Sequence, residues 1–184
     1  MEHKGTVLLE SERLILRKFT LDDVEAMYHN WAKDERVTKF MTWPYHKNTD
    51  STKMVIEFWM NDYNKLDYYQ WAICLKETNE PIGSISTVFT NEKTSAIEIG
   101  YCIGYNYWNK GYTTEALKRL IEFFFLEVGA NRISACHDVD NIASGKVMQK
   151  AGMKYEGTLR ASGMTGEGKL SDLAYYSILR NEFK

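Results

Sequence analysis

The chain has 184 residues, of which 44% are hydrophobic and 26% charged, and its formal net charge at pH 7 is −2. This composition is typical of a globular domain and excludes a disordered or fibrous chain. A nearly neutral chain has no overall basic field to hold nucleic-acid phosphates, so bulk nucleic-acid binding is not expected.

We expect one domain over residues 1–184, because the chain has only two prolines and neither a Ser/Gly-rich linker nor an internal repeat. Apolar residues that alternate predict seven strands, over residues 13–19, 71–75, 82–89, 95–103, 132–137, 153–159 and 173–179. Apolar residues at helical spacing predict four helices, over about residues 20–31, 51–63, 113–128 and 142–151. This order of elements predicts an α/β arrangement in which the front half of the sheet is antiparallel.

The cysteines and the first residues bear on the compartment. Cys74, Cys102 and Cys136 are odd in number and far apart, which fits neither a disulfide framework nor a zinc pattern. The charged start and the short apolar run 7–9 do not resemble a signal peptide, and no apolar run reaches the ~20 residues of a membrane helix. We therefore expect a soluble cytoplasmic protein with no membrane partner, and we leave a homodimer open.

The turn between the strand 95–103 and the helix 113–128 is the most informative segment. The first N–H groups of a helix have no partner within it, and the helix dipole is positive there, so such a terminus can hold a phosphate anion. Gly111 permits close approach of the backbone, and Lys110 adds a positive charge. A plain strand-to-helix turn explains the same residues, since neither a dinucleotide fingerprint nor a Walker A motif occurs in it.

Several motifs resemble the GNAT superfamily of N-acetyltransferases, and within it the branch that acetylates the N-termini of ribosomal proteins. They are Glu98-Ile-Gly-Tyr101, Trp108-Asn-Lys-Gly-Tyr-Thr-Thr-Glu-Ala116, Asn141-Ile-Ala-Ser144, Lys150-Ala-Gly-Met153, the opening Ser11–Arg17 and the closing Tyr176–Arg180. The resemblance implies a mixed, mostly antiparallel sheet of about seven strands flanked by four helices. It also implies a cleft for acetyl-CoA, the co-substrate, between the splayed fourth and fifth strands of the family fold, and no metal.

The same resemblance implies how the co-substrate would be held. Pantetheine would add alongside the strand end at Tyr101, Cys102 and Ile103. The pyrophosphate would lie on the backbone N–H groups of the following loop, which comprises Trp108, Asn109, Lys110, Gly111, Tyr112 and Thr113. The sequence departs from the family pattern at two positions, because Trp108 replaces Gln or Arg and Thr113 replaces Gly or Ala. Both changes keep the backbone donors.

Glu98 is the candidate base for acetyl transfer to an amine. It is the only acidic residue in the apolar run 96–104, and alternation places it with Gly100 and Cys102 on one strand face. The opposite face, with Ile97 and Ile99, is expected to pack under the helix 113–128. A solvated charge near the end of a hairpin is the alternative interpretation of Glu98.

The leaving thiolate also needs a partner. Many members of the family protonate it with a tyrosine on the fourth helix, and Met148 stands at that position here. Ser144 is the nearest substitute, and we expect Asn141 and Ser144 to contact CoA; the alternative is that they only cap and begin a helix. Lys150 is expected to reach the CoA phosphates, unless it is simply solvated.

Four other sequence patterns are candidates for functional sites. Residues 163–169 satisfy G-x-x-x-x-G-K, but leucine follows where a phosphate-binding loop needs Ser or Thr, so we expect a hairpin loop. Cys136 and His137 are neighbours in a strand, so they point to opposite faces and cannot form a nucleophile–base pair. The four histidines lack metal-ligand spacing. Trp43 and Tyr45 are expected to form a wall of the acceptor site, with core packing or a dimer contact as the alternative.

Together these features predict an acetyl-CoA-dependent N-acetyltransferase in which a primary amine attacks the thioester directly. The N-terminal α-amino group of a protein is the first candidate acceptor. A non-catalytic module that binds acyl-CoA as a sensor is the main alternative, and a nucleotide-phosphate enzyme that uses residues 163–169 is a second one.

Overall fold

The computed structural model describes residues 1–183, which form one eight-stranded sheet in the order β1-β2-β3-β4-β5-β6-β8-β7. The strands are β1 (Leu9–Glu10), β2 (Leu14–Arg17), β3 (Gln70–Leu75), β4 (Pro81–Asn91), β5 (Ala96–Ile103), β6 (Arg132–Asp138), β7 (Lys154–Met164) and β8 (Leu170–Leu179). The helices are α1 (Val24–Met27), α2 (Glu35–Thr38), α3 (Thr49–Asp62), α4 (Tyr112–Phe123) and α5 (Ile142–Lys150). Only β5 and β6 are parallel, so the predicted mixed, mostly antiparallel sheet is confirmed.

Two short elements distinguish the structure from the predicted seven strands and four helices. The strand β1 has two residues, Leu9 and Glu10, which pair with Leu16 and Ile15 of β2. The helix α2 has one turn, and the side chain of Asp34 caps it by accepting a hydrogen bond from the backbone N–H of Arg36. Neither element is long enough to show a period in the sequence.

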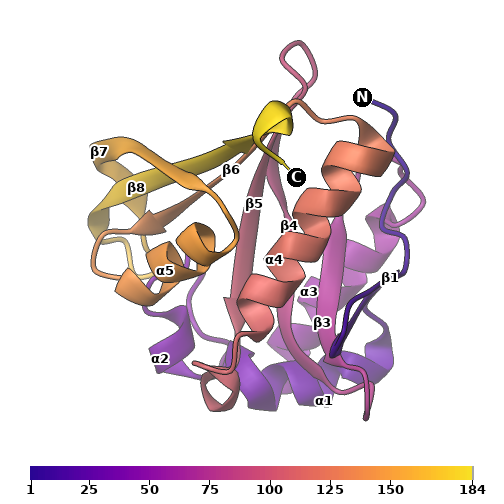
Figure 1. Ribbon diagram of the computed structural model, residues 1–184. Helices are drawn as coiled ribbons and strands as arrows, with labels where there is room; N and C mark the ends of the chain where they lie inside the picture. Colours follow the sequence, from indigo (N-terminus) through magenta and orange to yellow (C-terminus); the bar gives the residue numbers. More distant parts are fainter. Residues whose placement is uncertain (184) are drawn as a thin grey trace.

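Helices cover both faces of the sheet, with α4 and α5 on one face and α1 and α3 on the other (Figure 1). The predicted apolar stripe of α4 is buried and continues into a π-helical segment, Phe124–Val128, that ends at Gly129. Ile97 and Ile99 of β5 belong to the core beneath α4, whereas Cys102 belongs to the core on the other face. The alternation predicted for this strand is therefore confirmed.

The strands β5 and β6 pair over only three positions. Ala96 faces Arg132, Ile97 faces Ile133 and Glu98 faces Ser134, and beyond Glu98 the two strands have no register with each other. Figure 1 shows β6 and its neighbour β8 running away from β5 beyond this point. The splayed pair of strands implied by the family resemblance is thus present.

A small polar network fastens β6 to the outer strands. The Arg132 guanidinium donates to the Glu156 carboxylate at 2.7 Å and to the Ser177 hydroxyl at 2.8 Å. The Ser177 hydroxyl in turn donates to Glu156 at 2.6 Å. These contacts join one residue from each of β6, β7 and β8.

This network gives the protein an acid-dependent component of stability. The hydrogen bond from Arg132, followed by that from Ser177, lowers the pKa of Glu156 to about 2. Because this pKa is depressed in the folded state, the stabilisation is present above the ordinary pKa of 4.5 and is lost as the pH falls through about 2. Glu156 is partly exposed, so we expect Glu156→Gln to cost only about 1 kcal/mol at pH ~7.

Urea unfolding of the Glu156→Gln variant and the wild type between pH ~7 and ~2 measures this effect. The two stability curves should converge as the pH falls. Glu57→Gln, on the exposed surface of α3, is the matched control and should follow the wild type. A constant gap between Glu156→Gln and the wild type at all pH values would contradict the prediction.

Candidate functional site

A cleft of about 630 Å³ lies beside the end of β5, beyond the part of that strand that pairs with β6. Its walls come from the end of β5, the loop before α4, the first turn of α4, the length of α5, and the segment from α2 to Met41. It is lined by all but two of the residues expected to hold the co-substrate, namely Tyr101, Cys102, Ile103, Trp108, Asn109, Gly111, Thr113, Asn141, Ser144 and Lys150. Residues far apart in the sequence therefore meet at one place.

The loop before α4 has the geometry of an anion-binding turn. Asn109 and Gly111 both have left-handed backbones, with φ of +60° and +83°. Gly111 is the N-cap of α4, and no side chain within residues 1–183 caps the helix there. The first N–H groups of α4 consequently remain available as donors at the positive end of the helix dipole.

Arg13, which precedes β2, stabilises the loop before α4 through contacts of its guanidinium. Its guanidinium donates to Glu115 at 2.7–2.8 Å and to the carbonyl of Lys110 at 3.0 Å, and it lies 4.5 Å from the centre of the Tyr112 ring. Burial acts to raise the pKa of Glu115, but the hydrogen bonds from Arg13 and Ser11 outweigh it, and the pKa is lowered. No role for Arg13 was predicted from the sequence. Its position in the opening motif, Ser11–Arg17, is the one feature of the sequence that could have indicated this role.

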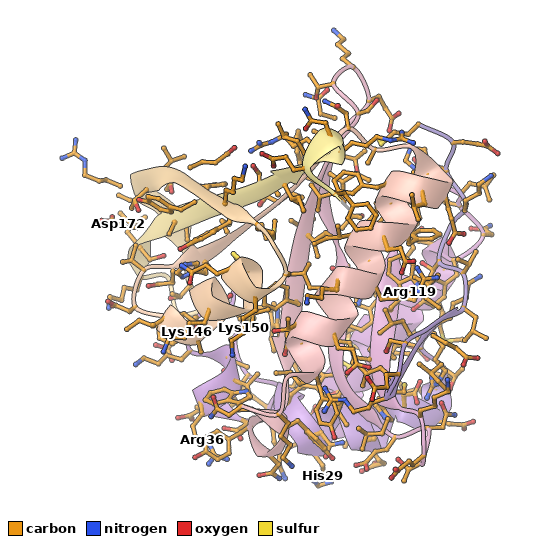
Figure 2. All side chains as sticks on the ribbon, in the orientation of Figure 1. His29, Arg36, Arg119, Lys146, Lys150 and Asp172 are labelled. Carbon is orange, nitrogen blue, oxygen red and sulfur yellow. The ribbon has the colours of Figure 1, made fainter. Side chains whose placement is uncertain are left out.

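Lys110 and Tyr112 do not line the cleft. The Lys110 ammonium lies 5.5 Å from the centre of the Tyr107 ring, and the Tyr112 ring lies against Arg13. Arg36 on α2 and Lys146 and Lys150 on α5 line the cleft instead (Figure 2). The two lysines supply the positive charge expected from Lys110, since the Arg36 guanidinium is paired with Asp34 at 2.6 Å.

Trp108 has a structural role at the position where the family usually has Gln or Arg. Its indole N–H donates to the carbonyl of Ile103 at 2.9 Å, and its ring lies 4.9 Å from that of Tyr105. The side chain therefore fastens the loop to the end of β5. This contact uses the carbonyl of Ile103 and leaves the backbone N–H groups from Asn109 to Gly111 available.

Glu98 lies at the closed end of the gap between β5 and β6, in the last pair before the strands separate. It is half-buried, is outside the residues that line the cleft, and accepts a hydrogen bond from the Cys136 thiol at 3.6 Å. Burial and the charge of Glu98 raise the pKa of Cys136 to about 11, so this cysteine is a thiol at neutral pH. Glu98 therefore lies outside the cleft, where β5 and β6 begin to separate, beside a neutral thiol.

The cysteines offer no activated nucleophile. Cys136 contacts Glu98, whereas the His137 ring lies 5.7 Å from the Tyr176 ring, whose residue belongs to the core beneath α4. The two neighbours thus lie on opposite faces, as alternation predicts. Burial also raises the pKa of Cys102.

Asn141 and Ser144 lie in the first turn of α5. The Asn141 side chain caps the helix by accepting a hydrogen bond from the Ser144 N–H at 3.3 Å, so the capping interpretation is confirmed, although both residues also line the cleft. The Ser144 hydroxyl lies 3.0 Å from the hydroxyl of Tyr101, across the gap between the strands. Met148 is buried in the core.

Residues 41–46 form a loop beside the cleft, which we call the tryptophan loop. Its Trp43 is partly buried against the core and lies 5.6 Å from the His46 ring, while Tyr45 is exposed. Neither side chain lines the cleft, whereas Met41 does. Packing therefore accounts for the position of Trp43.

The loop between β7 and β8 contacts the tryptophan loop. The N–H of Gly166 donates to the carbonyl of Met41 at 2.8 Å, and a Cβ at Gly166 would lie 2.2 Å from the carbonyl carbon of Trp43. Only glycine fits so close an approach. Because this segment joins two strands, the predicted hairpin loop is confirmed, and it lacks the following helix that a phosphate-binding loop requires.

Residues 1–183 show neither a membrane-spanning helix nor a cluster of metal-ligating side chains. No helix there is both long and apolar enough to cross a membrane. In the same range, His, Cys, Asp and Glu residues do not gather in any group of three or more that could hold a metal ion.

Comparisons with known proteins agree with this geometry. The family model of the acetyltransferase (GNAT) domain matches residues 13–154. An uncharacterized N-acetyltransferase, p20 of Bacillus licheniformis, is 32% identical over 95% of this chain and 97% of its own length. A GNAT-family acetyltransferase from Bacillus anthracis has a TM-score of 0.84 at 28% identity, over 95% of this chain and 99% of that chain.

A more distant structure shares the fold. RimL, a ribosomal L7/L12 α-N-protein acetyltransferase solved with coenzyme A, has a TM-score of 0.82 at 19% identity, over 94% of this chain and 98% of its own. The domain match and the identity with p20 over nearly the whole chain go beyond likeness of fold. The chain belongs to the GNAT family of acetyltransferases.

Proposed function

We propose that this protein transfers the acetyl group of acetyl-CoA to the N-terminal α-amino group of a protein. The observation that carries the proposal is the cleft beside the end of β5, which is lined by an uncapped helix N-terminus, together with the carboxylate of Glu98 on the same strand, where β5 and β6 begin to separate. The helix terminus suits an anion, and the Glu98 carboxylate suits the removal of a proton. RimL, which shares the fold, acetylates an α-amino group and was solved with coenzyme A.

The residues at the open end fit the phosphates of acetyl-CoA. The backbone N–H groups from Asn109 to Thr113 would hold the pyrophosphate, because α4 begins there without a side-chain cap. Lys146 and Lys150 would add charge from the opposite wall. Beyond Glu98 the edge of β5 that faces β6 has no strand partner, so it can add an extended pantetheine chain by strand-like hydrogen bonds.

The residues at the closed end fit the chemistry of acyl transfer. The amine nitrogen attacks the thioester carbon, and Glu98 takes the proton from that nitrogen through a water molecule. A backbone N–H near Ile103 polarises the carbonyl oxygen, which gains charge as the tetrahedral intermediate forms. The bond between carbon and sulfur then breaks, and the thiolate leaves beside Ser144.

Two features support an α-amino group over a lysine. An unperturbed α-amino group has a pKa near ~8, against ~10.4 for lysine, so a far larger fraction is neutral at pH 7 and a carboxylate base suffices. The second feature is the tryptophan loop, which Gly166 contacts and which would stand at the acceptor side of the cleft. The loop with Trp43 and Tyr45 would form the outer wall, and a chain terminus can enter past it more readily than the surface of a folded protein.

Release of free CoA thiol from acetyl-CoA, measured with three classes of amine, tests the proposal. Peptides with a free N-terminus should be acetylated, and the same peptides with a blocked N-terminus and an internal lysine should not. Turnover only with lysine or a polyamine would overturn the acceptor assignment. Calorimetric binding of CoA with no turnover of any amine would favour the acyl-CoA sensor, and no binding would overturn both.

A further inference from the structure

We propose that Tyr101 is a positioning residue whose hydroxyl directs the hydrogen of Ser144 toward the leaving sulfur of CoA. The inference rests on the proposed function and assigns the step in which the thiolate departs. Many members of the family use one tyrosine on a helix for this step. The proposal assigns it to a pair of residues, Tyr101 and Ser144, from the two sides of the cleft.

The pair is defined by geometry. The Tyr101 hydroxyl lies 3.0 Å from the Ser144 hydroxyl and 3.2 Å from the Ser144 carbonyl oxygen. Tyr101 is on β5 and Ser144 is on α5, and both residues line the cleft. The contact is therefore the hydrogen bond that bridges the two walls where the strands have separated.

The hydrogens in this pair can be arranged in two ways. A serine hydroxyl has one hydrogen to donate and two lone pairs that accept. If Tyr101 donates to the Ser144 hydroxyl, the serine hydrogen is free to point into the cleft. If Tyr101 donates to the Ser144 carbonyl instead, the serine hydrogen points at the tyrosine oxygen. An anionic sulfur in the cleft favours the first arrangement, because a hydrogen bond to a charged group is the stronger one.

Tyr101 itself does not supply the proton. Burial raises the pKa of Tyr101, so the phenol remains protonated and acts as a donor throughout the working range. Met148, at the position of the usual tyrosine acid, has no hydrogen to donate. The role that remains for Tyr101 is orientation, and the group that contacts sulfur is Ser144.

The step balances without a further reactant. The amine nitrogen forms a bond to the carbonyl carbon, and the bond between carbon and sulfur breaks with its electron pair on sulfur. The proton from nitrogen passes through water to Glu98. The thiolate is held by the hydrogen bond from Ser144 and later takes a proton from solvent.

Steady-state kinetics of Tyr101→Phe, Ser144→Ala and the double variant test the coupling. Each single variant should lower kcat about 10-fold, with the KM for acetyl-CoA within about twofold, since one hydrogen bond to a charged group is lost. The double variant should be no slower than Ser144→Ala, because both changes remove the same interaction. Tyr176→Phe is the matched control, since its hydroxyl accepts a hydrogen bond from Gln149 elsewhere on α5 at 3.2 Å, and it should retain wild-type kcat.

A second measurement uses CoA alone and needs no acceptor. The pKa of the bound CoA thiol, followed by the ultraviolet absorbance of the thiolate, should lie below that of free CoA in the wild type and in Tyr176→Phe. It should return toward the free value in Tyr101→Phe and Ser144→Ala. A wild-type enzyme that shows this shift without acetylating any amine would refute the proposed function and leave the pair intact.

Three results would overturn the proposal: additive losses in the double variant, an unchanged kcat in Tyr101→Phe, or an equal thiol pKa in all variants. If Tyr101→Phe fails to fold, Tyr101→Met, which is apolar and flexible and carries no donor, takes its place in both measurements. Ser144→Thr, which keeps a hydroxyl, should then restore the lowered thiol pKa.

Discussion

Replacing Glu98 with glutamine is expected to lower kcat/KM for a free-amine acceptor by about 100-fold near pH ~7. The carboxylate lies where β5 and β6 separate, and the amide that replaces it has nearly the same shape but accepts no proton. The loss should be largest at low pH, where most of the amine is protonated, and smaller above the amine pKa of ~8. Initial rates of thiol release across this pH range measure the effect.

The control for this variant is Glu57→Gln on α3, which makes the same change on the exposed surface. It should leave the pH profile unchanged. Affinity for CoA, measured by calorimetry, should be the same in Glu98→Gln as in the wild type, because Glu98 does not line the cleft. A Glu98→Gln enzyme with the wild-type pH profile would exclude Glu98 as the base.

Gly111→Val is expected to weaken the binding of CoA at least about 10-fold. Gly111 has φ of +83°, a conformation that costs a non-glycine residue about 1–3 kcal/mol. The backbone would relax away from it and turn the N–H groups at the start of α4, and a Cβ there would also lie 3.4 Å from the Arg13 guanidinium. Calorimetry with CoA measures the affinity, and urea unfolding measures the accompanying loss of stability.

Gly168→Val is the control that separates the effect of backbone strain on stability from the effect of the substitution on CoA binding. Gly168 has φ of +81° and no atom within 4 Å of a Cβ placed on it, and it lies in the loop between β7 and β8, away from the start of α4. This variant should lose a similar amount of stability and bind CoA as the wild type does. Equal losses of CoA affinity in the two variants would show that the phosphate site is not at Gly111.

Long periodic segments could be predicted from the sequence, and short elements could not. The stripe on α4 and the alternation of β5 each involve enough residues for the pattern to be clear, and both are buried as expected. The strand β1 has two residues and the helix α2 has four. The strand forms by pairing with another strand, and the helix is stabilised by a cap within its single turn. Neither the pairing with β2 nor the cap from Asp34 produces a periodic pattern of apolar residues in the sequence.

In the candidate site, too, local motifs could be predicted from the sequence and contacts between distant parts of the chain could not. The loop 108–113 and the start of α5 are local motifs, and most of their residues line the cleft. The direction of the Lys110 side chain depends on left-handed neighbours, which spacing does not reveal. The support from Arg13 and the bridge from Tyr101 to Ser144 join parts of the chain separated by 97 and 43 residues. Such contacts follow from the completed fold.

The three residue pairs between β5 and β6 have a mechanical consequence. They are the only register between the two parts of the sheet, β1 to β5 and β6 to β8, so they set the angle at which the parts diverge. A small rotation at this joint becomes a larger displacement at the far end of β5, at Ile103, and at α5, which follows β6 and carries Ser144. The width of the cleft therefore depends on Ile97 and Ile133, which are buried beneath α4. Replacing either side chain with a smaller one would alter the spacing between the two walls of the cleft without removing any group proposed to bind acetyl-CoA.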